Sequence, residues 1–271
     1  MKENDSPIIK GLFVIGGIVF LALTVGFFWQ MEWATSLWLW PDGRLSYIFI
    51  ASITAAIGVP LIWIGLSGEF GAARGGAINL GITALGTAIY LFYYYGQTGE
   101  PYILISAVIA AIGVPVNVAI FLWSNKIPIK DQRAMPGLVK ISFAFFGIVL
   151  IVVSLMLILR APVIFPWPLN PNSSVIFGLI FLGAAFYFLS ALQIPLWHSA
   201  RGQLLGFLAY DLVLFGPFLA HLSSVMPEHR LSLILYILVL VYSGALAVTY
   251  LFINKTTRPW GIQTEVSTIN N

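Results

Sequence analysis

Eight long apolar segments dominate this sequence. They cover residues 10–31, 45–66, 76–95, 102–124, 138–160, 174–196, 202–222 and 230–253. Roughly 20 helical residues, each rising 1.5 Å, cross a bilayer core about 30 Å thick. Backbone polar groups in lipid need partners within the chain, so each segment is expected to be a helix. The pattern therefore predicts a polytopic, all-α integral membrane protein with eight transmembrane helices.

The composition agrees with a lipid-facing surface. Hydrophobic residues make up 59% of the 271 residues and charged residues only 8%, whereas soluble domains carry about 25% charged residues. The net charge of +3 is too small to indicate a nucleic-acid partner. Membrane lipids, and possible neighbouring membrane subunits, are the partners that such a surface favours. We expect the protein in a plasma membrane of prokaryotic type.

Motifs for enzymatic chemistry and for cofactors do not stand out in the sequence. The chain has no cysteine, which excludes disulfides and thiolate metal ligands. It has no H-E-x-x-H, G-x-S-x-G or Walker motif, and no pair of histidines placed within the spans to hold a haem. We therefore expect neither a cofactor nor an enzymatic activity.

The distribution of Lys and Arg predicts the orientation, because cytoplasmic loops of membrane proteins are enriched in these residues. With a cytoplasmic N-terminus, three basic residues fall outside, namely Arg44, Arg160 and Arg230. The other ten fall inside, namely Lys2, Lys10, Arg74, Lys126, Lys130, Arg133, Lys140, Arg201, Lys255 and Arg258. Both termini are therefore expected in the cytoplasm.

The two halves of the chain resemble each other at an offset of 127 residues. Trp40-Pro41 recurs as Trp167-Pro168, Ser46 as Ser173, and Ala73-Arg74-Gly75 as Ala200-Arg201-Gly202. Each half holds four spans, an even number, so both halves enter the membrane in the same direction. The pattern predicts one membrane domain built as a tandem parallel duplication of a four-helix unit, with units at residues 10–126 and 138–255.

Asp211 is the acidic residue predicted deepest in a span, about nine residues from the inner end of the seventh segment. A charge at that depth costs at least about 2.5–3.5 kcal/mol on insertion scales, so such residues usually face the protein interior. We expect Asp211 to face the bundle, with Tyr187 or Asn117 within hydrogen-bonding reach. Its role is either functional, as in proton-coupled transport, or structural, as a link between helices.

Arg74 and Arg201 occupy equivalent positions in the two halves, at the inner turn between the second and third spans. They can bind a lipid phosphate or the carboxylate of a partner. The alternative is that they only anchor helix starts at the cytoplasmic surface.

Two functions from different classes fit these features. The duplicated bundle and Asp211 favour a small-solute or proton-coupled transporter. The short loops and the lack of catalytic motifs favour a structural or accessory subunit of a larger membrane complex.

Overall fold

The computed structural model describes residues 6–258, so Lys2 and the predicted cytoplasmic ends at residues 1–5 and 259–271 lie outside the described residues. The prediction of an all-helical protein with eight spans is confirmed for this part of the chain. The long helices are α1 (Pro7–Phe28), α3 (Arg44–Ser67), α4 (Ala73–Thr98), α5 (Pro101–Ser124), α6 (Gly137–Ile158), α7 (Pro171–Gln193), α8 (Trp197–His221) and α9 (Arg230–Val248).

Four short elements complete the fold. The helix α2 (Glu32–Thr35) lies in the connection between α1 and α3. The 3₁₀ turns η2 (Phe70–Ala72) and η3 (Pro227–His229) precede α4 and α9, and the π-helical turn η4 (Thr249–Ile253) continues α9. The segment 125–136 links α5 to α6 without a helix and makes one isolated antiparallel bridge, between Ala134 and Leu196.

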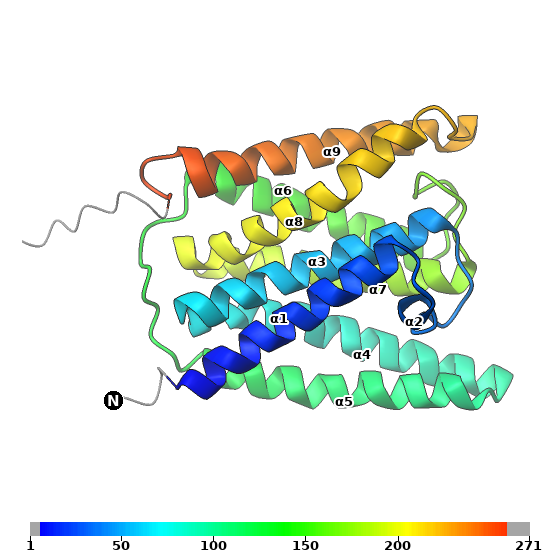
Figure 1. Cartoon of the computed structure of the whole chain (residues 1–271), viewed down its shortest axis with the longest axis horizontal. Helices are drawn as coiled ribbons and strands as arrows, with labels where there is room; N and C mark the ends of the chain where they lie inside the picture. The colour runs from blue at the N-terminus through cyan, green and yellow to red at the C-terminus, as the bar shows by residue number, and fades with distance from the viewer. Residues whose placement is uncertain (1–5, 259–271) are drawn as a thin grey trace, which may run out of the picture.

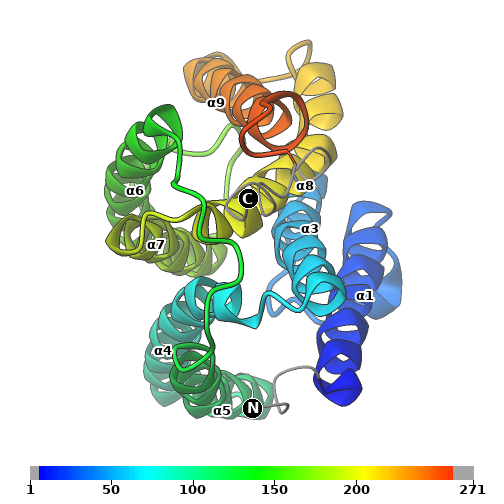
Figure 2. The same cartoon turned by 90° about the vertical axis from the view of Figure 1, so that its left-hand side faces the viewer.

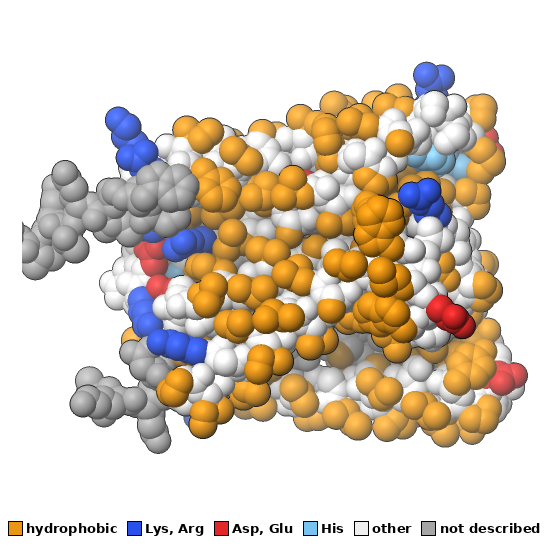
Figure 3. Space-filling view, viewed as in Figure 1, with side chains coloured by type: hydrophobic (Ala, Val, Ile, Leu, Met, Phe, Trp, Pro, Cys, Tyr) orange, Lys and Arg blue, Asp and Glu red, His pale blue; other side chains and the backbone are white. Residues whose placement is uncertain are grey.

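The long helices run side by side along the longest axis of the molecule (Figure 1). One end carries the start of α1, the segment 125–136 and the end of α9, and we call it the linker end. The opposite end, which we call the far end, carries α2 and the connections from α6 to α7 and from α8 to α9. Hydrophobic side chains cover the band between the ends, and the charged side chains on the visible face gather at the two ends (Figure 3). The eight apolar helices thus indicate a membrane-embedded protein.

The helices form two rows that face each other (Figure 2). The first row runs in the order α1, α3, α8, α9, and the second runs α5, α4, α7, α6, with each helix packed on its neighbours in the row. Each row therefore contains helices from both halves of the chain. The four N-terminal spans do not form a separate bundle, because α3 packs far more on α8 than on α4.

An aromatic cluster joins the rows in the interior. The ring of Phe49 in α3 lies 4.8 Å from that of Phe177 and 5.6 Å from that of Phe181, both in α7. Phe49 and Phe177 are fully buried. Aromatic pairs at these separations stabilise a core beyond the area that they bury.

A polar cluster joins the rows at the far end. Asp42 accepts a hydrogen bond from Ser46 of α3, at 3.3 Å, and another from Ser173 of α7. The indole of Trp167 also donates to Ser46, at 2.9 Å. One carboxylate thus connects two serines that lie 127 residues apart in the sequence.

Candidate functional site

Asp211 faces the protein, as predicted. Its side chain is 5% exposed, and the hydroxyl of Ser243 in α9 lies 3.0 and 2.9 Å from its two carboxylate oxygens. Gly244 of α9 lies beside the carboxyl group: an added Cβ would be 3.4 Å from the nearer carboxylate oxygen, an ordinary van der Waals distance. The carboxyl group therefore links α8 to α9 within the first row.

The predicted partners of Asp211 are wrong. The amide of Asn117 donates to the carbonyl oxygen of Gly113 in its own helix, at 2.8 Å. The ring of Tyr187 packs against Gly75 of α4, and its hydroxyl lies against Gly202 of α8. The prediction assumed that the consecutive spans six and seven pack closely, whereas α8 packs mainly on α3 and α9 and only slightly on α7.

A small pocket opens at the linker end, where the two rows meet. Its walls come from the start of α4, the end of α7 and the start of α8; they include Arg74, Gly75, Tyr187, Ser190, His198 and Ser199. It offers about 20 Å³ to the centre of a water-sized molecule, and roughly 10–15 Å³ of such space holds one water. The structure therefore brings Arg74 and Tyr187 into one site, while Asp211 and Asn117 do not line that site.

Arg74 is the cationic residue that lines this pocket. Its guanidinium packs over the ring of Phe121, at 5.6 Å, and one terminal nitrogen donates to the amide oxygen of Gln193, at 3.4 Å. Its Nε–H is buried and has no hydrogen-bond partner among the described residues. A buried donor without a partner costs stability.

Arg201, which was predicted to be the counterpart of Arg74, occupies a different environment. Its guanidinium lies over the ring of Trp63, 5.3 Å from the centroid, in a cation–π contact. It is not among the residues that line the pocket.

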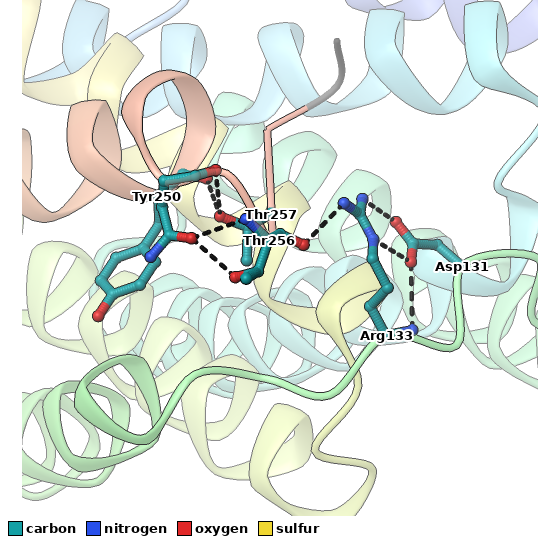
Figure 4. A network of polar contacts seen from close by, with 6 residues as sticks. Asp131, Arg133, Tyr250, Thr256 and Thr257 are labelled. Carbon is teal, nitrogen blue, oxygen red and sulfur yellow. Dashed lines mark hydrogen bonds and ion pairs between the residues drawn. The ribbon is translucent and has the colours of Figure 1, made fainter. Parts of the chain in front are cut away.

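Hydrogen bonds and an ion pair hold the segment 125–136 across the linker end. The guanidinium of Arg133 makes two hydrogen bonds to the carboxylate of Asp131, at 2.9 and 2.6 Å, and donates to the backbone oxygen of Thr256, at 3.0 Å (Figure 4). Burial alone would raise the pKa of Asp131, but the hydrogen bonds and charge of Arg133 outweigh it and hold the pKa below its ordinary value of 3.8. The segment also pairs with the α7–α8 turn, since the amide of Trp197 donates to the oxygen of Arg133, at 2.7 Å.

Glu69 is a second carboxylate that contacts this segment. It is 8% exposed, and burial raises its pKa even though the backbone amides of Lys130 and Asp131 favour its charged form. Glu69 and Asp131 both belong to the linker end, but neither lines the pocket.

Sequence reasoning missed several residues of these sites. Ser243 carries no signal, because a serine in an apolar helix usually bonds to its own backbone, as Ser243 also does to the oxygen of Val239. Ser190 was missed for the same reason, since its hydroxyl donates to a backbone oxygen of its own helix. Ser199 was missed because it lies in the short segment that the sequence placed between two spans, whereas it belongs to the first turn of α8. His198 is visible in the sequence at the predicted inner surface, but its role in a pocket depends on how α4, α7 and α8 converge.

The fold and the pocket define an eight-helix membrane protein with a polar site between two helix rows. No protein-family model matches the chain, and no curated protein or solved structure matches it. The functional assignment therefore rests on the geometry of the described residues.

Proposed function

We propose that this chain is a transporter of a small solute and that the linker-end pocket is its binding site. The position of the pocket carries the proposal. Arg74, Tyr187 and Ser190 come from the second row, whereas His198 and Ser199 come from the first. A solute held there contacts both rows, so movement of one row against the other would change its access to either side.

The depth of the pocket fits an entry site near one membrane surface. Tyr187 lies six residues before the last residue of α7, Gln193, which is about 9 Å at 1.5 Å per residue. The pocket therefore lies nearer the linker end than the middle of the helices.

A tandem parallel duplication is part of the proposal, with the units at residues 10–126 and 138–255. A Cβ added at Gly183 of α7 would lie 2.4 Å from the backbone oxygen of Asn79 in α4. A Cβ added at Gly206 of α8 would lie 3.0 Å from the backbone oxygen of Ala56 in α3. Adding 127 to positions 56 and 79 gives 183 and 206, so the two close contacts exchange under the sequence offset.

The helix packing supports the same relationship. The offset relates α3 to α7 and α4 to α8, and the contact of α3 with α8 has its counterpart in the contact of α4 with α7. The pairs α1–α3 and α6–α7 correspond in the same way, as do α4–α5 and α8–α9. This exchange is expected of two parallel repeats related by an axis along the membrane normal, an arrangement found in transporters whose site lies between the repeats.

The linker end is proposed to face the cytoplasm of a prokaryotic cell. Nine basic residues of the described chain belong to this end by sequence, namely Lys10, Arg74, Lys126, Lys130, Arg133, Lys140, Arg201, Lys255 and Arg258. The far end has Arg44, Arg160 and Arg230. An excess of Lys and Arg on one side is the usual mark of the cytoplasmic surface.

The proton-coupled version of transport is not favoured by the position of Asp211. Its carboxyl group is bonded to Ser243 in the seam between α8 and α9 and does not line the linker-end pocket. We assign Asp211 the structural role of joining two helices of the first row.

Uptake into liposomes tests the proposed function. The purified chain is reconstituted, and uptake of radiolabelled small anions, cations and neutral solutes is compared with uptake by empty liposomes. We expect one class to be taken up in a saturable manner by the wild type. Ser190→Trp, which fills the pocket, should reduce this uptake at least tenfold.

A tryptophan on the lipid-facing surface provides the matched control. Ile105 of α5 is 60% exposed, so Ile105→Trp should leave uptake unchanged. If Ser190→Trp takes up the solute as fast as the wild type, the linker-end pocket is not the binding site. No saturable uptake of any class by the folded wild type contradicts transport, and partner chains that then copurify would favour the accessory-subunit role.

A further inference from the structure

The chemistry of the linker-end pocket indicates which solutes it can bind. Its polar side chains are the guanidinium of Arg74, the phenol of Tyr187, the hydroxyls of Ser190 and Ser199, and the imidazole of His198. The hydroxyl of Ser190 already donates to the backbone oxygen of Tyr187, at 2.7 Å, and that of Ser199 lies 3.1 Å from Nε2 of His198. The guanidinium of Arg74 and the phenol of Tyr187 remain as donors for a ligand, and no carboxylate is among the lining residues. The side chains therefore favour a ligand that accepts hydrogen bonds.

The donors of Arg74 are only partly used by the protein. The bond to Gln193 is long, at 3.4 Å, and Gln193 itself is exposed. The buried Nε–H has no partner among the described residues and exposes almost no surface, so the terminal nitrogens are the ones left to hold a ligand in the pocket. Carboxylates match a guanidinium because they accept two parallel hydrogen bonds.

The helix ends contribute to the potential in the pocket. The starts of α4 and α8 both border it, and neither helix has a side-chain hydrogen bond at its N-cap, which is Ala72 in one and Leu196 in the other. Each start carries a partial positive charge of about half an elementary charge. The C-terminal end of α7 also borders the pocket, and its partial negative charge offsets one of these two partial positive charges. Arg74 adds a full positive charge in the wall of the pocket.

The carboxylates of Asp131 and Glu69 lie outside the pocket, although the charge of Asp131 acts on His198 in its wall. Asp131 accepts three hydrogen bonds from Arg133, two from the guanidinium and one from the backbone amide. Glu69 accepts hydrogen bonds from the backbone amides of Lys130 and Asp131. The space of about 20 Å³ limits the bound group to roughly the size of one to two water molecules. A carboxylate group or a halide meets this limit, whereas a bulky polyanion does not.

We infer that the linker-end pocket binds a compact, singly charged anion between Arg74 and Tyr187, and that small anions are the solutes that the protein carries. The inference rests on the proposed function, because it names the class of solute for the same site. The shared chemistry is a single negative charge on a small acceptor, which a carboxylate and a halide both provide.

Thermal unfolding of the purified full chain in a neutral detergent tests the binding. Sodium acetate and sodium chloride are titrated separately at constant ionic strength, which is set with sodium HEPES because its sulfonate belongs to a bulky molecule. We expect a saturable rise of the unfolding midpoint with at least one of these anions, because a ligand that binds only the folded state stabilises it. Acetamide, the neutral analogue of acetate, should give no saturable rise.

Two variants and a matched control locate the site. Arg74→Gln should raise the dissociation constant of the anion at least about tenfold, since hydrogen bonds to charged groups are the stronger ones. Tyr187→Phe removes one hydroxyl and should raise it roughly twofold to tenfold. Arg201→Gln removes a cation from the equivalent position outside the pocket and should leave the dissociation constant unchanged.

The outcomes separate this inference from the proposed function. The inference is overturned if acetate or chloride raises the unfolding midpoint of Arg74→Gln and of Tyr187→Phe as it does that of the wild type. It is also overturned if vesicles of phosphatidylglycerol raise the midpoint while acetate and chloride do not, because the occupant would then be a lipid phosphate. If a neutral or cationic solute is taken up by liposomes without anion binding, the inference fails and transport stands. If the anion binds at Arg74 but no solute is taken up, transport fails and the anion site stands.

Discussion

Ser243 of α9 lies 3.0 and 2.9 Å from the two carboxylate oxygens of Asp211 in α8, within the apolar part of the first row. Both side chains are buried, at 1% and 5% exposure. The serine has one hydroxyl proton, which it can also share with the backbone oxygen of Val239. The pair therefore holds two neighbouring helices together without using the linker-end pocket.

Substitutions at Asp211 are expected to change stability according to shape and hydrogen bonding. Asp211→Asn keeps the shape and the hydrogen bonding of the side chain, so the free energy of unfolding should hardly change. Asp211→Leu removes the bond between α8 and α9 and should lower the free energy of unfolding by about 0.6 kcal/mol, and by no more than about 1.7 kcal/mol, the mean and the maximum measured for hydrogen bonds between membrane helices. Unfolding by a denaturing detergent provides the measurement.

Uptake by the same variant tests whether Asp211 carries protons. In the structural role, Asp211→Asn leaves the ratio of uptake at pH 6 to uptake at pH 8 equal to that of the wild type. Loss of the pH dependence in a variant of normal stability contradicts this role and favours a proton carrier.

The close contact of α4 with α7 depends on a glycine. A Cβ at Gly183 would lie within 2.5 Å of the backbone oxygen of Asn79 and of two side-chain oxygens, including that of Thr83. Gly183→Ala is expected to cost about 1–3 kcal/mol through overpacking. Gly76 of α4 has no atom within 4 Å of an added Cβ, so Gly76→Ala should be neutral or slightly stabilising because alanine favours helix. Equal unfolding free energies for the two variants contradict the close contact.

The eight spans and their approximate limits could be predicted from the sequence, because hydropathy and the thickness of a bilayer determine them. The seventh span starts five residues earlier than predicted, at Trp197, since the short polar run His198-Ser199-Ala200-Arg201 continues into helix. The four-residue helix α2 was not predicted, because Glu32–Thr35 is too short to show a periodic pattern.

The lateral order of the helices could not be predicted in the same way. Hydropathy gives the number of spans but not which helix packs on which, so the contact of α8 with α3 and α9 was missed. The serine partner of Asp211 was missed with it. Arg74 and Tyr187 were identified separately, whereas their common pocket depends on a contact between spans that are distant in the sequence.

The fastening of the segment 125–136 should depend on pH through Asp131. The pKa of Asp131 lies below its ordinary value of 3.8 in the folded protein. The ionised carboxylate therefore adds to the stability of the folded state in full above pH 3.8, and this stabilisation is lost as the pH falls through the lower pKa of the folded state. The pair with Arg133 is partly exposed, at 16% and 26%, so its contribution is at most about 1 kcal/mol.

Hydrogen exchange measures this contribution at the amides of Met135 and Trp197, which bond to the oxygens of Pro195 and Arg133. At pH 7, Asp131→Asn should accelerate their exchange, relative to intrinsic rates, by up to about fivefold. The difference in exchange rate between the variant and the wild type should shrink below pH 3.8. The amide of Ser174, at the far end, should exchange equally in the variant and the wild type both at pH 7 and below pH 3.8. Equal exchange in variant and wild type at pH 7 contradicts the role of the pair.

Cysteine labelling tests the orientation in the membrane, since the chain has no cysteine of its own. Cysteines at Gly99 or Asn170, at the far end, should react with an impermeant thiol reagent added outside cells. A cysteine at Gln132 should react only after the cells are opened. The same holds for one at Thr264, which lies outside the described residues. The reverse pattern contradicts a cytoplasmic linker end.

The most direct test of transport by movement of the two rows is a cross-link between them. Ser46 and Ser173 bind the same carboxylate, that of Asp42, from opposite rows. Thr24 and Thr54 lie 2.9 Å apart within the first row. Uptake is measured with the pairs Ser46→Cys/Ser173→Cys and Thr24→Cys/Thr54→Cys, each before oxidation, after oxidation and after reduction. We predict that the oxidised cross-link between the rows stops uptake, that reduction restores it, and that the cross-link within one row has no effect. Undiminished uptake with a complete disulfide between Ser46→Cys and Ser173→Cys would contradict the account.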